Sequence, residues 1–193
     1  MLAALVVVTV VAAGVVSHER ATSKSMAHGA AAAPPWPAPA GLSTKTDRGD
    51  LAGLHNVYGE KLAEHIHSHL SIVIDGQHVA VPGQVGLDES DHFATSLHTH
   101  NTSGIIHIES PVKSTFTLGQ FFTEWNVRLD RFHVGSAGDG FAESLTVFVD
   151  GRRVVGDPAA IVLRDLEDIE LVIAPTGMAV HPETAFDWPS NYH

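Results

Sequence analysis

One segment of this chain presents two chemically different faces if the strand predicted at residues 67–75 extends back to Glu64. The alternate positions are His65, His67 and His69 on one side and Ile66, Leu70, Ile72 and Ile74 on the other, with Ser68 among the latter. Because successive side chains of a β-strand point to opposite sides of the sheet, the histidines share one face. We therefore expect a sheet whose apolar face is covered and whose opposite face carries imidazoles.

Further strand signals follow this segment. Asp75-Gly76 and Asp150-Gly151 are typical of two-residue hairpin turns. Alternating or apolar runs around them and elsewhere predict strands at residues 67–75, 77–81, 104–109, 145–150 and 169–174. The chain therefore contains two predicted hairpins, with a further strand after the first and a final strand after the second.

One helix is predicted between the two hairpins, at residues 117–127. Thr117 can cap it, and its apolar stripe consists of Leu118, Phe121, Phe122 and Trp125. The order is hairpin, strand, helix, hairpin and final strand. It predicts an α+β fold, namely a β-grasp-like mixed sheet with one main helix packed across it.

Three segments carry a resemblance to a known fold family. Residues 117–122 read Thr-Leu-Gly-Gln-Phe-Phe, residues 147–154 read Val-Phe-Val-Asp-Gly-Arg-Arg-Val, and residues 163–172 read Leu-Arg-Asp-Leu-Glu-Asp-Ile-Glu-Leu-Val. Over roughly residues 67–174 the chain resembles ubiquitin-like sulfur-carrier proteins, which implies their β-grasp fold. It does not imply their chemistry, because those carriers end in Gly-Gly and this sequence ends in Asn191-Tyr192-His193.

A second histidine-rich stretch lies at residues 97–109, which read Leu-His-Thr-His-Asn-Thr-Ser-Gly-Ile-Ile-His-Ile-Glu. Together with the first His-x-His strand, this stretch is similar to that of a set of exported, His-rich bacterial and archaeal proteins without an assigned activity. The resemblance implies a site but no particular reaction. Residues 83–102 are also longer than a simple β-grasp needs, which indicates a functional insertion.

Two His-x-His pairs and one further histidine have the spacing of metal ligands. The predicted ligands are His65, His67, His98, His100 and His107. His107 takes the polar face of its predicted strand and can meet the first pair there, while the second pair can close over that face. Imidazole binds copper and zinc, and Cu(II) leads the affinity order, so we expect copper first and zinc second. The spacing leaves open which of His65, His67 and His69 take part.

The absence of cysteine narrows the set of ligands, because it excludes thiolates.

The main hypothesis for the function is a protein that captures or delivers the metal ion. The alternative is a metal-dependent enzyme with an open coordination position and Glu109 as a possible base. Glu109 is also consistent with a solvated residue at a strand end. A pH-responsive histidine surface and a metal buffer without fixed geometry are two further hypotheses.

The N-terminal part of the sequence predicts export. Residues 2–16 contain only Ala, Leu, Val, Thr and Gly, a length typical of a signal peptide and short of the roughly 20 residues of a membrane-spanning helix. We expect residues 1–17 to be a signal peptide or signal anchor, residues 18–49 a disordered Ala/Pro-rich linker, and residues 50–193 the His-rich domain. The protein would then lie outside the cytoplasm, either secreted or held to the membrane by an uncleaved N-terminus.

The charge of the chain bears on its partners. The formal net charge of −11 argues against nucleic acid as a partner, because nucleic-acid binding needs a basic surface. The expected partner is the metal ion that the spacing of the histidines predicts. The sequence leaves the identity of a protein partner open.

Overall fold

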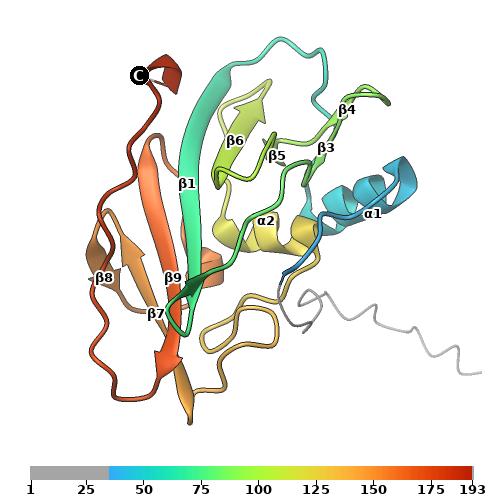
Figure 1. The fold of residues 1–193 in the computed structure, drawn as a ribbon. Coiled ribbons are helices and arrows are strands. Elements are labelled where there is room, and N and C mark those ends of the chain that lie inside the picture. The colour runs from blue at the N-terminus through green and yellow to red at the C-terminus, as the bar shows by residue number, and fades with distance from the viewer. Residues whose placement is uncertain (1–34, 193) are drawn as a thin grey trace, which may run out of the picture.

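The computed structural model describes residues 35–192, which form an α+β fold (Figure 1). The helices are α1 (Leu42–Ala52) and α2 (Leu118–Trp125), with the 3-10 turns η1 (Pro158–Ala160) and η2 (Ser190–Tyr192). The strands are β1 (Glu64–Ile74), β2 (Gln77–His78), β3 (Leu87–Asp88), β4 (Phe93–Ala94), β5 (Leu97–His98), β6 (Ile105–Ser110), β7 (Glu143–Val149), β8 (Arg152–Val154) and β9 (Glu167–Pro175). The expected leader, residues 1–17, lies outside the described residues. Within residues 35–192, no helix is long and apolar enough to cross a membrane.

Seven of these strands form one mixed sheet, and β3 and β4 form a separate small hairpin. The strand order is β5-β6-β1-β9-β7-β8, and β2 pairs with the end of β1. β1 and β9 run parallel at the centre, whereas β6 and β7 are antiparallel to them. The second hairpin, which turns at Asp150-Gly151, and the final strand are confirmed.

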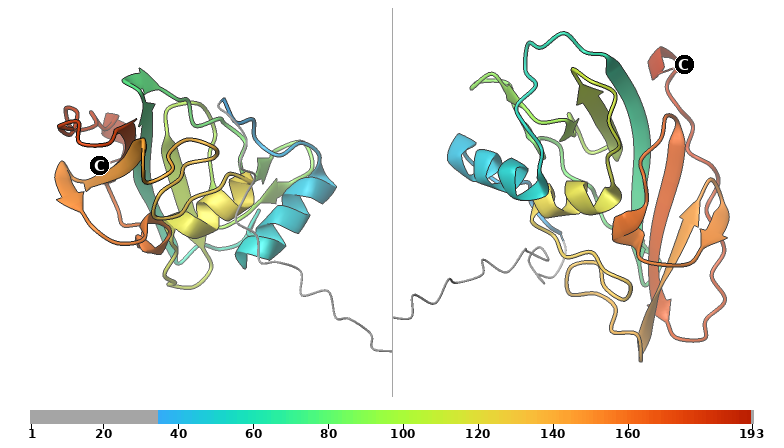
Figure 2. Two further views of the ribbon diagram at one scale, coloured as in Figure 1. Left: turned by 90° about the horizontal axis from the view of Figure 1, so that it is seen from below. Right: turned by 180° about the vertical axis from the view of Figure 1, so that it is seen from behind.

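The apolar face of the sheet packs against α2, as the sequence predicted. Thr117 and Gln120 form a capping box at its start, and Asn126 ends it in the left-handed conformation. The apolar helix residues in the core are Leu118, Phe121, Phe122 and Trp125, together with Leu70, Ile72, Ile106 and Ile108 from the sheet. Figure 2 shows both helices on one side of the sheet and the C-terminal segment on the other. The predicted helix at residues 117–127 is therefore confirmed.

The sequence predicted a linker over residues 18–49, and this prediction is wrong for residues 42–49, which form the first part of helix α1. Ahead of it, Trp36 is buried with its ring 5.8 Å from that of Trp125, whose Nε1 donates to the Trp36 carbonyl. Lys45 is also buried, and its Nζ donates to the Leu87 carbonyl and to Asp88. The buried residues of α1 are Lys45, Gly49 and Ala52. A helix without a stripe of large apolar residues gives no periodic signal, and tertiary contacts hold it in place.

The first hairpin is shorter than predicted, and the insertion after it is ordered. β2 covers residues 77–78 instead of 77–81. Residues 83–102 contain the β3-β4 hairpin and β5, which joins the edge of the large sheet beside β6. Gly86 has a φ of 63°, and a Cβ there would collide with the carbonyl oxygen of Leu97. The close approach of the backbone at Gly86 to Leu97 lets the insertion fold back so that His98 lies in β5 at the sheet edge.

A buried acid lies where α2 meets the insertion. Glu124 is 1% exposed, its Oε1 lies 2.7 Å from Thr95 Oγ1, and its Oε2 has no partner among residues 35–192. Burial raises the pKa of Glu124 to about 8, although the nearby Arg48 favours ionisation. The carboxyl group is therefore mostly protonated in the folded protein at neutral pH.

We expect Glu124→Gln to remove a loss of stability at high pH. Between the ordinary pKa of 4.5 and the folded value of about 8, the unfolded chain ionises this group and the folded chain does not. The free energy of unfolding then falls by up to about 1.4 kcal/mol per pH unit, whereas glutamine stays neutral. Chemical denaturation at several pH values should show the variant gaining stability over the unmutated protein as the pH rises through this range. The exposed Glu60→Gln serves as the control, and a difference independent of pH would contradict the prediction.

Candidate metal centre

Strand register places three histidines in one row on the polar face of the sheet. His107 on β6 has His67 of β1 as its partner on one side and His98 of β5 on the other. Residues directly opposite one another on adjacent strands point to the same face. The neighbours Ile106 and Ile108 belong to the core. The division into an apolar and a histidine-bearing face is therefore confirmed for β1, and β5 and β6 extend it.

His65 and His100 lie at the two ends of this row and complete a group of five rings, which we call the histidine cluster. The ring centroid of His107 lies 4.6 Å from that of His67, 5.9 Å from His65, 5.3 Å from His98 and 4.5 Å from His100. The rings of His65 and His67 are 4.8 Å apart, and those of His98 and His100 are 5.1 Å apart. The structure thus brings all five predicted residues together around His107.

The ring nitrogens of the histidine cluster fall into two groups of three. One triad is His65, His67 and His107, and the other is His98, His100 and His107. Within each triad the ligand nitrogens lie within 4.8 Å of one another. Two nitrogens bound to one zinc ion at about 2.1 Å lie no more than about 4.2 Å apart, so each triad is close in size to a coordination shell. Either triad could hold a metal ion.

His98 is oriented to bind through one particular nitrogen. Its side chain is buried, and its Nδ1 lies 2.9 Å from the carbonyl oxygen of Thr95. A carbonyl oxygen only accepts, so Nδ1 donates its proton there and Nε2 keeps a free lone pair. Burial also lowers the pKa of His98, which keeps its ring neutral. A hydrogen bond from the other ring nitrogen is how proteins usually orient a metal-binding histidine.

His107 has no such hydrogen bond. Its Nδ1 is buried and has no partner among the described residues. Burial and, secondly, the surrounding histidines lower the pKa of His107 to about 3. A buried polar atom without a partner costs on the order of 1–3 kcal/mol. A metal ion bound at this nitrogen would remove that free-energy cost.

A carboxylate lies at each end of the histidine cluster. Glu109 Oε1 is 3.2 Å from His65 Nε2, and Glu89 Oε1 is 3.7 Å from His100 Nδ1. Glu109 is the residue that the sequence marked as a possible base, and here it contacts an imidazole. The side chains of His65 and His100 are 49% and 42% exposed. The cluster is therefore accessible to solvent at both ends.

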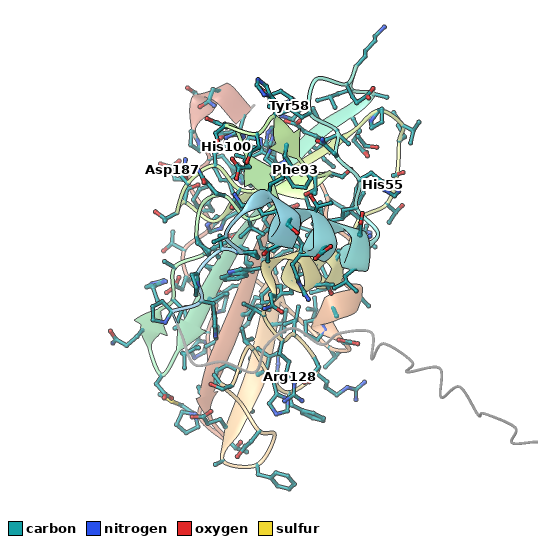
Figure 3. The ribbon with its side chains drawn as sticks, turned by 90° about the vertical axis from the view of Figure 1, so that its right-hand side faces the viewer. His55, Tyr58, Phe93, His100, Arg128 and Asp187 are labelled. Carbon is teal, nitrogen blue, oxygen red and sulfur yellow. The ribbon has the colours of Figure 1, made fainter. Side chains whose placement is uncertain are left out.

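His69, whose role the sequence left open, belongs to neither triad. Its Nδ1 lies 2.7 Å from Asp168 Oδ1, and its ring stacks on Phe186 with the centroids 3.7 Å apart. These contacts hold the ring within a separate aromatic and acidic environment. His55 is exposed and lies well apart from His100 in the view of Figure 3. Proximity in sequence therefore does not by itself bring a histidine into the cluster.

The C-terminal segment, residues 176–192, runs along the same face of the sheet as the histidines. Two carboxylates of β9 hold it: Asp168 Oδ2 accepts a hydrogen bond from the Phe186 backbone at 3.0 Å, and Glu170 Oε2 accepts one from the Glu183 backbone at 3.0 Å. The segment ends near the top of β1 (Figure 1). It is thus fixed by polar contacts outside the histidine cluster.

The end of this segment contacts the first triad. The Tyr192 ring lies 4.5 Å from that of His67, measured between centroids. Beside the segment lies a cavity of about 400 Å³, lined by His69 and by none of the five clustered histidines. The sequence did not predict this arrangement. Its only signal is the aromatic residues of a short tail, namely Phe186, Trp188 and Tyr192.

Comparisons with known proteins supply no relative for this chain: no protein family, no curated protein and no solved structure matches it. The interpretation of the site therefore depends on its own geometry. That geometry is two overlapping histidine triads, each with a carboxylate beside one of its exposed histidines.

The low pKa of His107 predicts that its imidazole stays neutral in the metal-free protein where an ordinary histidine becomes charged. In a ¹⁵N NMR titration we expect no protonation of His107 between pH 7 and about pH 4. His107→Ala assigns the resonance. Since the folded pKa is below the unfolded one, the corresponding stability is present above about pH 6.5 and is lost as the pH falls toward 3. A titration midpoint near 6.5 would show the prediction to be wrong.

Proposed function

We propose that this protein binds a transition metal outside the cytoplasm, copper first and zinc second, and captures or delivers it. The observation that carries this proposal is the central His107, which belongs to both triads and whose buried Nδ1 has no hydrogen-bond partner within residues 35–192. Neutral imidazoles held this close together are expected where a metal ion is their common partner. A pH-responsive surface would instead need rings that charge near neutral pH, which burial opposes at His107 and His98.

The choice of metal follows from the donor atoms. The histidine cluster offers imidazole nitrogens, with carboxylate oxygens at its ends, and the chain has no cysteine. Such ligands suit Cu(II) and Zn(II), and the affinity order places Cu(II) above Zn(II). Copper is therefore the metal expected to bind most tightly to the isolated protein.

Binding is favoured over catalysis by what surrounds the histidine cluster. A metal-dependent enzyme needs an open coordination position beside a shielded substrate pocket. Here Glu109, the candidate base, contacts His65, and the cavity of about 400 Å³ lies at His69. The exposure of His65 and His100 gives a metal ion a path in and out. These features support an exchangeable binding site.

We also propose that the fold is of the β-grasp type and that the protein lies outside the cytoplasm. We assign the sheet to the β-grasp type because β6, β1, β9, β7 and β8 are adjacent in that order, with a parallel central pair and α2 across one face. The apolar run at residues 2–16 supports export, and the resemblance to exported His-rich proteins supports it too. The protein would act while secreted or while anchored by its N-terminus.

Metal binding is tested on the full chain, purified in mild detergent and freed of metal. After loading with Cu(II) or Zn(II) and removal of excess, mass spectrometry should find at least one ion per chain. Competition with a chelator should then show that His65→Ala/His67→Ala and His98→Ala/His100→Ala each weaken binding. Loss of ligands should cost more than the roughly 100-fold that loss of an outer hydrogen-bond partner can cost.

The matched control is His55→Ala/His181→Ala, which also removes two imidazoles but from exposed positions outside the triads. It should leave the amount and affinity of bound copper unchanged. Substoichiometric metal in the unmutated protein would overturn the proposal. An equal loss of binding in the control would also overturn it, because the binding would then come from scattered histidines.

A further inference from the structure

His107 occupies a position that no other member of the histidine cluster shares. Its strand, β6, lies between β1 and β5, so that His67 and His98 flank it on opposite sides. Strands in a sheet are spaced about 4.8 Å apart, which separates the strands of His67 and His98 by about 9.6 Å. The two His-x-His pairs therefore approach His107 from opposite neighbouring strands, β1 and β5.

Both ring nitrogens of His107 are free to act as ligands. Within residues 35–192 neither nitrogen takes part in a hydrogen bond, and Nδ1 is buried. His98 differs, because its Nδ1 is occupied by the Thr95 carbonyl and only its Nε2 remains. An imidazole carries its two nitrogens on different edges of the ring, so a ring without other partners can bind one ion at each.

Each triad is also completed in the same way. The first combines one His-x-His pair with His107 and has Glu109 beside its outer histidine, His65. The second combines the other His-x-His pair with His107 and has Glu89 beside His100. The cluster thus supplies two donor sets of the same composition, each with a carboxylate that offsets part of the charge of a divalent ion.

We infer that the histidine cluster holds two metal ions, one in each triad, bridged by the imidazolate of His107. This inference rests on the proposed metal-binding function and deepens it. A neutral His107 carries one N–H proton. Binding of the second ion replaces that proton, which leaves to solvent, so that the bridging ring carries one negative charge. Three negative charges, from the imidazolate, Glu109 and Glu89, then face the four positive charges of two divalent ions.

Copper titration of the metal-free full chain tests the bridge. Mass spectrometry should find two copper ions per chain. The first equivalent should give an ordinary Cu(II) electron paramagnetic resonance signal. The second should reduce the low-temperature signal per copper to less than half, because spins couple through a bridging imidazolate. Filling the second site with Zn(II) in place of copper should restore the full signal.

His65→Ala/His67→Ala provides a second measurement. This pair is chosen because both side chains are less buried than that of His98, so that their removal should disturb the fold less. It should retain a single copper with an uncoupled signal, and circular dichroism checks that it is folded. His55→Ala/His181→Ala should keep two coupled ions.

The possible outcomes separate the bridge from metal binding itself. One ion per chain, or two ions with full uncoupled signals, would overturn the bridge and leave the proposed function intact. No bound ion would overturn both.

Discussion

The register of β6 between β1 and β5 is the constraint on which the rest of the structure depends. Because His107 pairs with His67 and with His98, a slip of one residue in either pairing would turn histidines into the core. Ile106 and Ile108 oppose such a slip, since both are almost fully buried and each stabilises the native register by about 1.5–3 kcal/mol. The apolar face of the sheet therefore fixes the geometry of the polar one.

Much of this arrangement can be predicted from sequence because it depends on local periodicity. Alternation places the histidines of β1 and His107 on one face, and the spacing at His98 and His100 marks the second pair. The capping box and apolar stripe of α2 are equally local signals. What periodicity does not give is the pairing of β5 with β6, and this pairing divides five candidate ligands into two triads.

The features that sequence did not predict are those that depend on partners distant along the chain. His69 has the same spacing as His67, yet Asp168 and Phe186, about a hundred residues later, hold its ring outside the triads. Helix α1 buries Lys45 against the insertion. The burial of a lysine can be predicted from sequence only when the groups that accept its hydrogen bonds are known. The strand signals sufficed for β1, β6, β7 and β9, whereas β5 and the elements around the sheet depend on tertiary contacts.

One residue of the insertion, Thr95, connects these added elements to the site. Thr95 contacts Glu124 of α2 with its hydroxyl and accepts the Nδ1 proton of His98 with its carbonyl. Gly49 of α1 lies against the same threonine, where a Cβ would be 3.0 Å from its methyl carbon. The orientation of His98 therefore depends on how the two helices pack on the insertion, although both helices lie on the opposite side of the sheet from the C-terminal segment. A segment that resembles a linker in sequence thus helps to hold one of the two triads in place.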